Sequence, residues 1–163
     1  MPEDMPAPRR EDAFVVFAQR SDARIDVQVW SAHAERFFAT RLGLTADKRY
    51  AGEEPRTDQA TFVVAPKGEP PGMRHVFARP GQADDFALAE AADTAGTGLA
   101  LLARRCGMVW LVLREVRRDP LALRLAAILA SVLLGPILDY STNELFGVKT
   151  ARAKLDRFHT SDH

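Results

Sequence analysis

His75 is the titratable residue whose setting most favours catalysis. It lies in residues 73–79 (MRHVFAR), where strand alternation places it on one face with Met73 and Phe77. If that face belongs to the core, the imidazole lines a partly apolar cavity and could act as a general acid or base. Arg79 and Tyr140 are the candidate polar partners. The simpler interpretation is a strand histidine that bonds to a neighbour.

Cys106 is the only cysteine of the chain. Arg105 beside it would favour a thiolate, but a position near a helix C-terminus disfavours one, so we expect a buried, inert thiol. A single cysteine excludes an internal disulfide and a paired-cysteine zinc site. It is typical of a reducing compartment, and we expect a cytoplasmic protein.

Six arginines crowd residues 104–124, offset there by Glu115 and Asp119. They are Arg104, Arg105, Arg114, Arg117, Arg118 and Arg124. Such a stretch could bind phosphate, an acidic partner or RNA. However, the interleaved aromatic residues of an RNA platform are missing, and 22 basic residues balance 22 acidic ones. We therefore expect a solvated, partly ion-paired surface and no dedicated nucleic-acid binding; whether an acidic partner binds is left open.

The familiar catalytic signatures are absent from the sequence. It contains no phosphate-binding GxxxxGK loop, GxSxG elbow, HExxH motif or CxxC pair, so we expect neither a cofactor nor a metal. Asp139, Tyr140 and Glu144 lie close together, and a tyrosine beside carboxylates can bind a polar ligand. The more economical interpretation is that Ser141 and Glu144 form a capping box that begins a helix.

The element that must organise the chain is residues 121–138. Asp119 and Pro120 are helix-start signals and Gly135 with Pro136 is a stop, so a helix is predicted. The segment is apolar nearly all round, which requires burial on two sides. Its uncharged run, residues 125–138, is shorter than the roughly 20 residues that span a bilayer, so membrane association is not expected.

The second side of this helix could pack within the chain or against a second copy. Within the chain, the expected neighbour is a helix from Asp84 or Asp85 to Cys106 that is rich in small residues. Across a homodimer, the interface candidates would be Leu123, Ala126, Ala130, Leu134 and Ile137. We expect the protein to self-associate as a homodimer, and the sequence does not decide which packing the helix uses.

Hydrophobic periodicity predicts five strands and four helices. The strands are residues 13–19, 24–30, 60–65, 73–79 and 108–113, and the helices are 31–43, 84–106, 121–138 and one after Ser141. The order ββα-ββα-β-αα predicts an α+β fold, in which helices pack on one face of a mainly antiparallel sheet.

The length of 163 residues suggests one domain. We expect a disordered tail at 1–12, a single domain at 13–159 and a frayed tail at 160–163. The first twelve residues contain prolines and acids where a signal peptide needs a basic start and an apolar centre, so export is not expected.

Two functional hypotheses follow. The first is a non-catalytic module that binds a small molecule or a protein and self-associates; the helix at 121–138 would supply a seam or the floor of an apolar pocket. The alternative is a small enzyme that uses His75, with Arg79 or Tyr140, on a polar small molecule. Catalysis requires His75 in a cleft with a second polar group in reach, whereas binding requires a pocket or seam near the helix.

Overall fold

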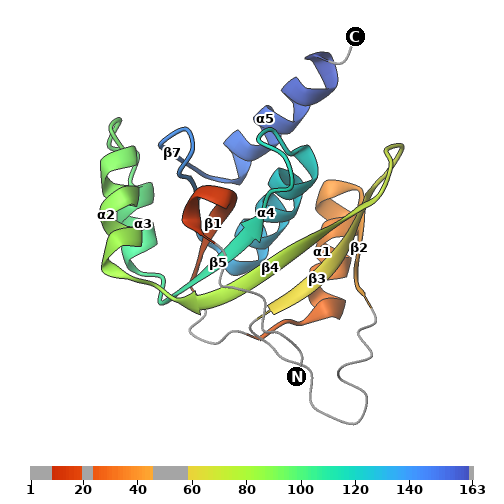
Figure 1. Ribbon diagram of the computed structural model, residues 1–163, viewed down its shortest axis with the longest axis horizontal. Helices are drawn as coiled ribbons and strands as arrows, with labels where there is room; N and C mark the ends of the chain where they lie inside the picture. Colours follow the sequence, from red (N-terminus) through yellow and green to blue (C-terminus); the bar gives the residue numbers. More distant parts are fainter. Residues whose placement is uncertain (1–8, 20–23, 46–58, 162–163) are drawn as a thin grey trace.

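The computed structural model describes residues 9–19, 24–45 and 59–161. For residues 159–161 it describes the backbone alone. In the described part seven strands form one sheet in the order β2-β3-β4-β5-β1-β6-β7, and every neighbouring pair is antiparallel (Figure 1). The predicted α+β fold with a mainly antiparallel sheet is confirmed, with seven strands where five were expected.

The strands are β1 (Ala13–Ala18), β2 (Thr40–Leu44), β3 (Gln59–Pro66), β4 (Gly72–Pro80), β5 (Met108–Leu113), β6 (Ile137–Asp139) and β7 (Glu144–Phe146). The helices are α1 (Val27–Phe38), α2 (Ala83–Ala92), α3 (Leu99–Arg104), α4 (Pro120–Leu133) and α5 (Val148–Ser161). A 3-10 turn, Arg10–Asp12, precedes β1, within the region predicted as a tail.

Helices cover both faces of the sheet, not one. Phe14 and Val16 of β1 pack toward α4 in the larger core, which α1 and α5 complete. Val15 and Phe17 of the same strand pack toward α2 and α3 on the opposite face (Figure 1). Because β1 is apolar on both sides, the centre of the sheet needs cover on both sides.

Helix α4 starts as predicted and ends earlier. Asp119 accepts a hydrogen bond from the Ala122 N–H at 3.1 Å, and Pro120 occupies the first turn. The helix stops at Leu133. A Cβ on Gly135 would lie 1.8 Å from the Phe17 carbonyl oxygen, so only glycine permits this close approach to β1. The residues after Gly135 then pair with β1 as β6, where the sequence predicted more helix.

Residues 24–30 were predicted to be a strand, and this is wrong. Asp26 caps helix α1 by accepting the Val29 N–H at 3.2 Å. Trp30, Ala34 and Phe38 follow at helical spacing and are all buried, so their burial outweighs the strand-like alternation before them. The predicted helix at 31–43 therefore ends at Phe38, and Gly43 lies within β2.

The predicted helix at 84–106 is two helices. Between them the Asp93 side chain accepts the N–H groups of Thr97 at 2.9 Å and Ala100 at 3.2 Å, which caps the start of α3. The predicted capping box at Ser141 and Glu144 is also wrong, because Glu144 pairs with Asp139 across the β6–β7 hairpin and α5 begins only at Val148.

Four of the five interface candidates are buried within the chain's own core. Leu123, Ala126, Ala130 and Ile137 are at most 3% exposed, whereas Leu134 is 60% exposed. The second side of α4 is covered by α1 and α5, not by the predicted 84–106 neighbour, which lies across the sheet. Self-association stays a prediction, and these buried positions offer it no accessible surface.

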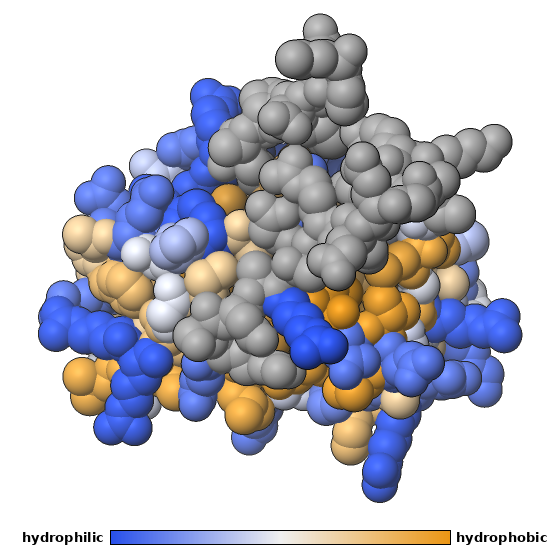
Figure 2. Space-filling model, turned by 90° about the horizontal axis from the view of Figure 1, so that it is seen from below, coloured by the Kyte–Doolittle hydropathy of each residue, from blue (hydrophilic) through white to orange (hydrophobic). Residues whose placement is uncertain are grey.

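Exposed large apolar side chains in the described part are spread over several elements. They are Val29, Phe37, Leu44, Met73, Leu101, Val116 and Leu134. On the face in Figure 2, apolar side chains lie among hydrophilic ones. Within the described residues, no helix is long and apolar enough to cross a membrane.

The difference in exposure between Ala130 and Leu134, at the C-terminal end of α4, allows the packing of this helix to be tested with two arginine substitutions. Ala130→Arg should destabilise the fold by about 3 kcal/mol or more, because it forces a long charged side chain into a packed core. Leu134→Arg, at the exposed end of the same helix, should change stability by no more than about 0.5 kcal/mol. Urea unfolding followed by circular dichroism measures the free energy of unfolding of both variants. A value for Ala130→Arg equal to that of wild type would contradict this packing.

Candidate functional site

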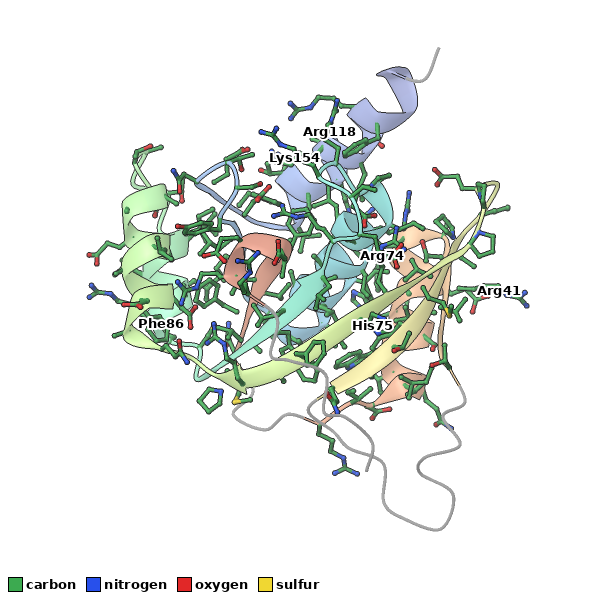
Figure 3. All side chains as sticks on the ribbon, in the orientation of Figure 1. Arg41, Arg74, His75, Phe86, Arg118 and Lys154 are labelled. Carbon is green, nitrogen blue, oxygen red and sulfur yellow. The ribbon has the colours of Figure 1, made fainter. Side chains whose placement is uncertain are left out.

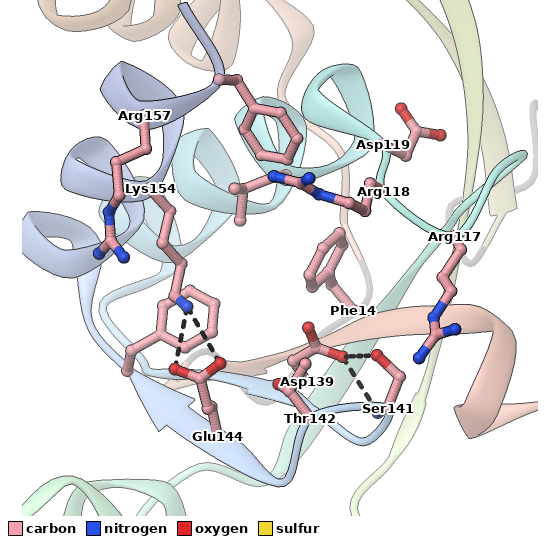
Figure 4. A pocket seen from close by; sticks show the side chains of 13 residues that line it. Phe14, Arg117, Arg118, Asp119, Asp139, Ser141, Thr142, Glu144, Lys154 and Arg157 are labelled. Atoms are coloured by element: carbon pink, nitrogen blue, oxygen red, sulfur yellow. Dashed lines mark hydrogen bonds and ion pairs between the residues drawn. The ribbon is translucent and has the colours of Figure 1, made fainter. Parts of the chain in front are cut away.

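A pocket of about 230 Å³ opens between the β5–α4 loop, the β6–β7 hairpin and α5 (Figure 4). Its apolar lining comes from Phe14, Leu123, Phe146 and Phe158. Its polar lining is Arg117, Arg118, Asp119, Asp139, Ser141, Thr142, Glu144, Lys154 and Arg157. The pocket therefore combines an apolar surface with charges of both signs.

A buried ion pair fixes the loop on one side of the pocket. Arg74 of β4 donates from Nε to Asp119 Oδ2 at 2.8 Å and from Nη2 to Oδ1 at 2.9 Å. Asp119 also accepts the Glu115 N–H at 2.9 Å, and its carboxylate is turned away from the pocket (Figure 4). The Asp119 carboxylate thus bonds the start of segment 115–119, which carries Arg117 and Arg118, and fixes the end of that segment to Arg74.

The charge of Asp119 is maintained by its hydrogen bonds. Burial alone would raise the pKa of Asp119, but the bonds from Arg74 and from the N–H groups of Glu115 and Ala122 outweigh it and hold the pKa below the ordinary 3.8. Asp119 is therefore ionised at neutral pH and committed to Arg74, and it is no acceptor for a ligand.

Arg117 and Arg118 are two cations at the edge of the pocket that have no carboxylate partner in the part of the chain that the structure describes. Both are exposed, and neither has an ion-pair partner among the described residues. The Arg118 guanidinium lies 5.0 Å from the centre of the Phe158 ring, and it extends over the pocket above Phe14 (Figure 4). Its N–H donors are available to an anion held against the aromatic surface.

Asp139 presents one carboxylate oxygen to the pocket. Its Oδ1 accepts from Arg114 Nη1 at 2.9 Å and from Ser141 Oγ and N at 2.7 and 3.1 Å. Its Oδ2 has no hydrogen-bond donor among the described residues and turns inward (Figure 4). Burial would raise the pKa of Asp139, but the Ser141 and Arg114 bonds lower it overall, so the carboxylate is ionised.

Lys154 and Glu144 close another side of the pocket. Lys154 Nζ donates to both Glu144 oxygens, at 2.9 and 3.1 Å, and lies 5.0 Å from the centre of the Phe146 ring. These two charges neutralise each other. Arg157 follows one turn later on α5 and adds positive charge on the same side (Figure 4).

The three candidate catalytic residues do not meet. His75 Nδ1 lies 2.6 Å from Thr61 Oγ1, and Arg79 is bonded to the buried Asp85 at 2.6 and 2.9 Å. Tyr140 follows β6, three strand spacings from β4, or about 14 Å across the sheet. None of the three lines the pocket, and Figure 3 shows His75 on β4 away from Arg118.

The other residues singled out from the sequence also separate. Cys106 is buried, and burial raises the pKa of its thiol to about 11, which disfavours a thiolate. The arginine-rich stretch is not one patch: Arg104 pairs with Glu90 and Arg124 with Glu69 on different parts of the surface. Of the six arginines, Arg117 and Arg118 line the pocket.

Sequence reasoning found part of the pocket. It singled out Arg117, Arg118, Asp139 and Glu144, but in separate groups. It assigned no role to Lys154, which lies on α5 and bonds Glu144. Lys154 and Arg157 are one helical turn apart, and this spacing was the sequence signal that places both cations on one face of the last helix.

Comparison with protein-family models, with curated proteins and with solved structures finds no match to this chain. The chemistry of the pocket therefore carries the functional interpretation.

The Arg74–Asp119 pair can be tested by stability. Asp119→Ala should destabilise the protein by about 3–5 kcal/mol at pH 7, because it removes the α4 cap and leaves buried Arg74 with only the longer, 3.4 Å ion pair to exposed Glu115. Since the folded-state pKa of Asp119 is below 3.8, this stabilisation is complete above that pH and lost as the pH falls through the lowered value.

Urea unfolding of both proteins between pH 7 and pH 3 measures the effect. Asp12→Ala, which removes an exposed pair with Arg9, is the control and should cost less than about 1 kcal/mol. A difference between wild type and Asp119→Ala that grows on acidification would contradict this assignment.

Proposed function

We propose that the protein is a non-catalytic module that binds a small molecule with an anionic group on an apolar body. The observation that carries the proposal is the pair Arg117 and Arg118, without carboxylate partners in the described part, beside a pocket lined by three phenylalanines. An anion bonded to the guanidinium groups would extend its apolar part over Phe14 and Phe146. Leu123 of α4 also lines the pocket, which supports the hypothesis that this helix forms the floor of an apolar pocket.

The lining chemistry supports binding over catalysis. The described residues that line the pocket include no histidine, cysteine or tyrosine. The pKa values of Asp119 and Asp139 are lowered, so these carboxylates are weak bases near neutral pH. The alternative, an enzyme that uses His75, stays a prediction, and Arg79 is already bonded to Asp85.

The dimensions favour a small metabolite. The pocket, at about 230 Å³, is below the roughly 300–1,000 Å³ of sites for drug-sized ligands. A ligand of about ten non-hydrogen atoms at roughly 0.3–0.6 kcal/mol each would bind with a Kd on the order of 0.1 to 10 mM. Metabolites at high cellular concentration fit such an affinity.

Two further sequence-based expectations belong to this proposal. We place the protein in the cytoplasm, where its one thiol, Cys106, remains reduced. We also keep self-association as a property to be measured by native mass spectrometry, with its surface outside the buried side chains of α4.

Calorimetric titration with 3-phenylpropionate tests the binding role. We expect millimolar or tighter binding that weakens with salt, and a loss of 10-fold or more in Arg118→Ala, because a hydrogen bond to a charged group is worth about 1.5–3 kcal/mol. Arg41→Ala is the control: Arg41 is exposed on β2 and projects away from the pocket (Figure 3). No binding to wild type of either this acid or L-phenylalanine, or equal losses in both variants, would refute the proposal.

A further inference from the structure

We infer that the pocket takes a zwitterionic ligand of the amino-acid class, with an ammonium group on Asp139, a carboxylate on Arg118 and an apolar side chain over the phenylalanines. This inference rests on the proposed function and names its ligand class. Its basis is the second oxygen of Asp139, which faces the pocket without a donor among the described residues (Figure 4).

The two oxygens of Asp139 have different surroundings. Three donors from Arg114 and Ser141 converge on Oδ1, which fixes the orientation of the carboxylate. The side chain is only 13% exposed, so bulk water reaches little of it. A carboxylate held in this way, with an open acceptor aimed into a pocket, is a preorganised site for a positively charged N–H donor.

The free oxygen of Asp139 separates a zwitterion from a simple anion. Each carboxylate that lines the pocket is paired with a cation: Asp119 with Arg74, Asp139 with Arg114 and Glu144 with Lys154. Both oxygens of Asp119 and of Glu144 accept hydrogen bonds, whereas Asp139 accepts only through Oδ1 among the described residues. A simple anion on Arg118 would leave Oδ2 without a donor, and an ammonium group on the same ligand would donate to it.

The arrangement of the walls also suits an α-amino acid. The β5–α4 loop supplies Arg118, the β6–β7 hairpin supplies Asp139, and Phe14 lies between them (Figure 4). An α-amino acid carries its two charged groups on one carbon and directs its side chain away from both. That side chain would meet Phe14 and Phe146, which form the apolar part of the pocket.

A series of three compounds tests the inference on the wild-type protein. L-Phenylalanine carries both charges, 3-phenylpropionate lacks the ammonium group, and phenethylamine lacks the carboxylate. We expect calorimetry to show L-phenylalanine binding at least 10-fold more tightly than either fragment. L-Leucine should bind within about 10-fold of L-phenylalanine, because the apolar surface sets no strict requirement for a ring.

Asp139→Asn is the sharpest variant. Asparagine keeps an acceptor for the Ser141 and Arg114 donors and places an NH₂ group where Oδ2 faced the pocket. We expect it to abolish the preference for L-phenylalanine over 3-phenylpropionate, and to bind 3-phenylpropionate as well as or better than wild type. Asp84→Asn, an exposed residue of α2 on the other face of the sheet, is the control for lost charge and should keep the wild-type preference.

The outcomes separate the inference from the proposed function. If L-phenylalanine binds wild type no more tightly than 3-phenylpropionate, the zwitterion inference is overturned while anion binding stands. If neither compound binds, both are overturned. Because the compound series uses the wild-type protein, the inference is decided even if Asp139→Asn does not fold.

Discussion

The buried pair between Arg74 and Asp119 is the constraint on which the rest of the molecule depends. It joins β4, near its start, to the beginning of α4, the helix at the centre of the core. An unpaired charge at either position would be strongly destabilising, so the two residues hold strand, loop and helix in one arrangement. The same carboxylate also bonds the Glu115 N–H, which positions the loop of Arg117 and Arg118.

The sheet brings the other wall of the pocket to this loop. Because β6 pairs with β1 beside β5, the hairpin after β6 lies near the end of β5, and Arg114 reaches Asp139 at 2.9 Å. Gly135 allows this path, since a larger residue would collide with Phe17 as the chain leaves α4. Stability and the proposed site therefore depend on the same packing.

The sequence predicted correctly those elements whose formation depends on neighbouring residues in the chain. Asp119 and Pro120 mark the start of α4, and the alternation in residues 60–65 and 73–79 marks β3 and β4. The predictions for residues 24–30 and 141–144 were wrong because the sequence of each segment fits both a helical and a strand pattern. Burial of Trp30 decides the first, and pairing of Asp139 with Glu144 decides the second. The pocket could not be assembled from sequence, since the contact of Lys154 with Glu144 requires the final placement of α5.

Amide chemical-shift mapping tests the central claim most directly, because it locates the ligand without any substitution. On addition of L-phenylalanine to ¹⁵N-labelled protein, we expect saturable shifts in the β5–α4 loop, in the β6–β7 hairpin and in α5 around residues 154–158, the three segments that surround the pocket. Amides of β2 and β3, at the far edge of the sheet, should not move. Shifts centred on His75 and Thr61, or no saturable shifts at all, would contradict the account.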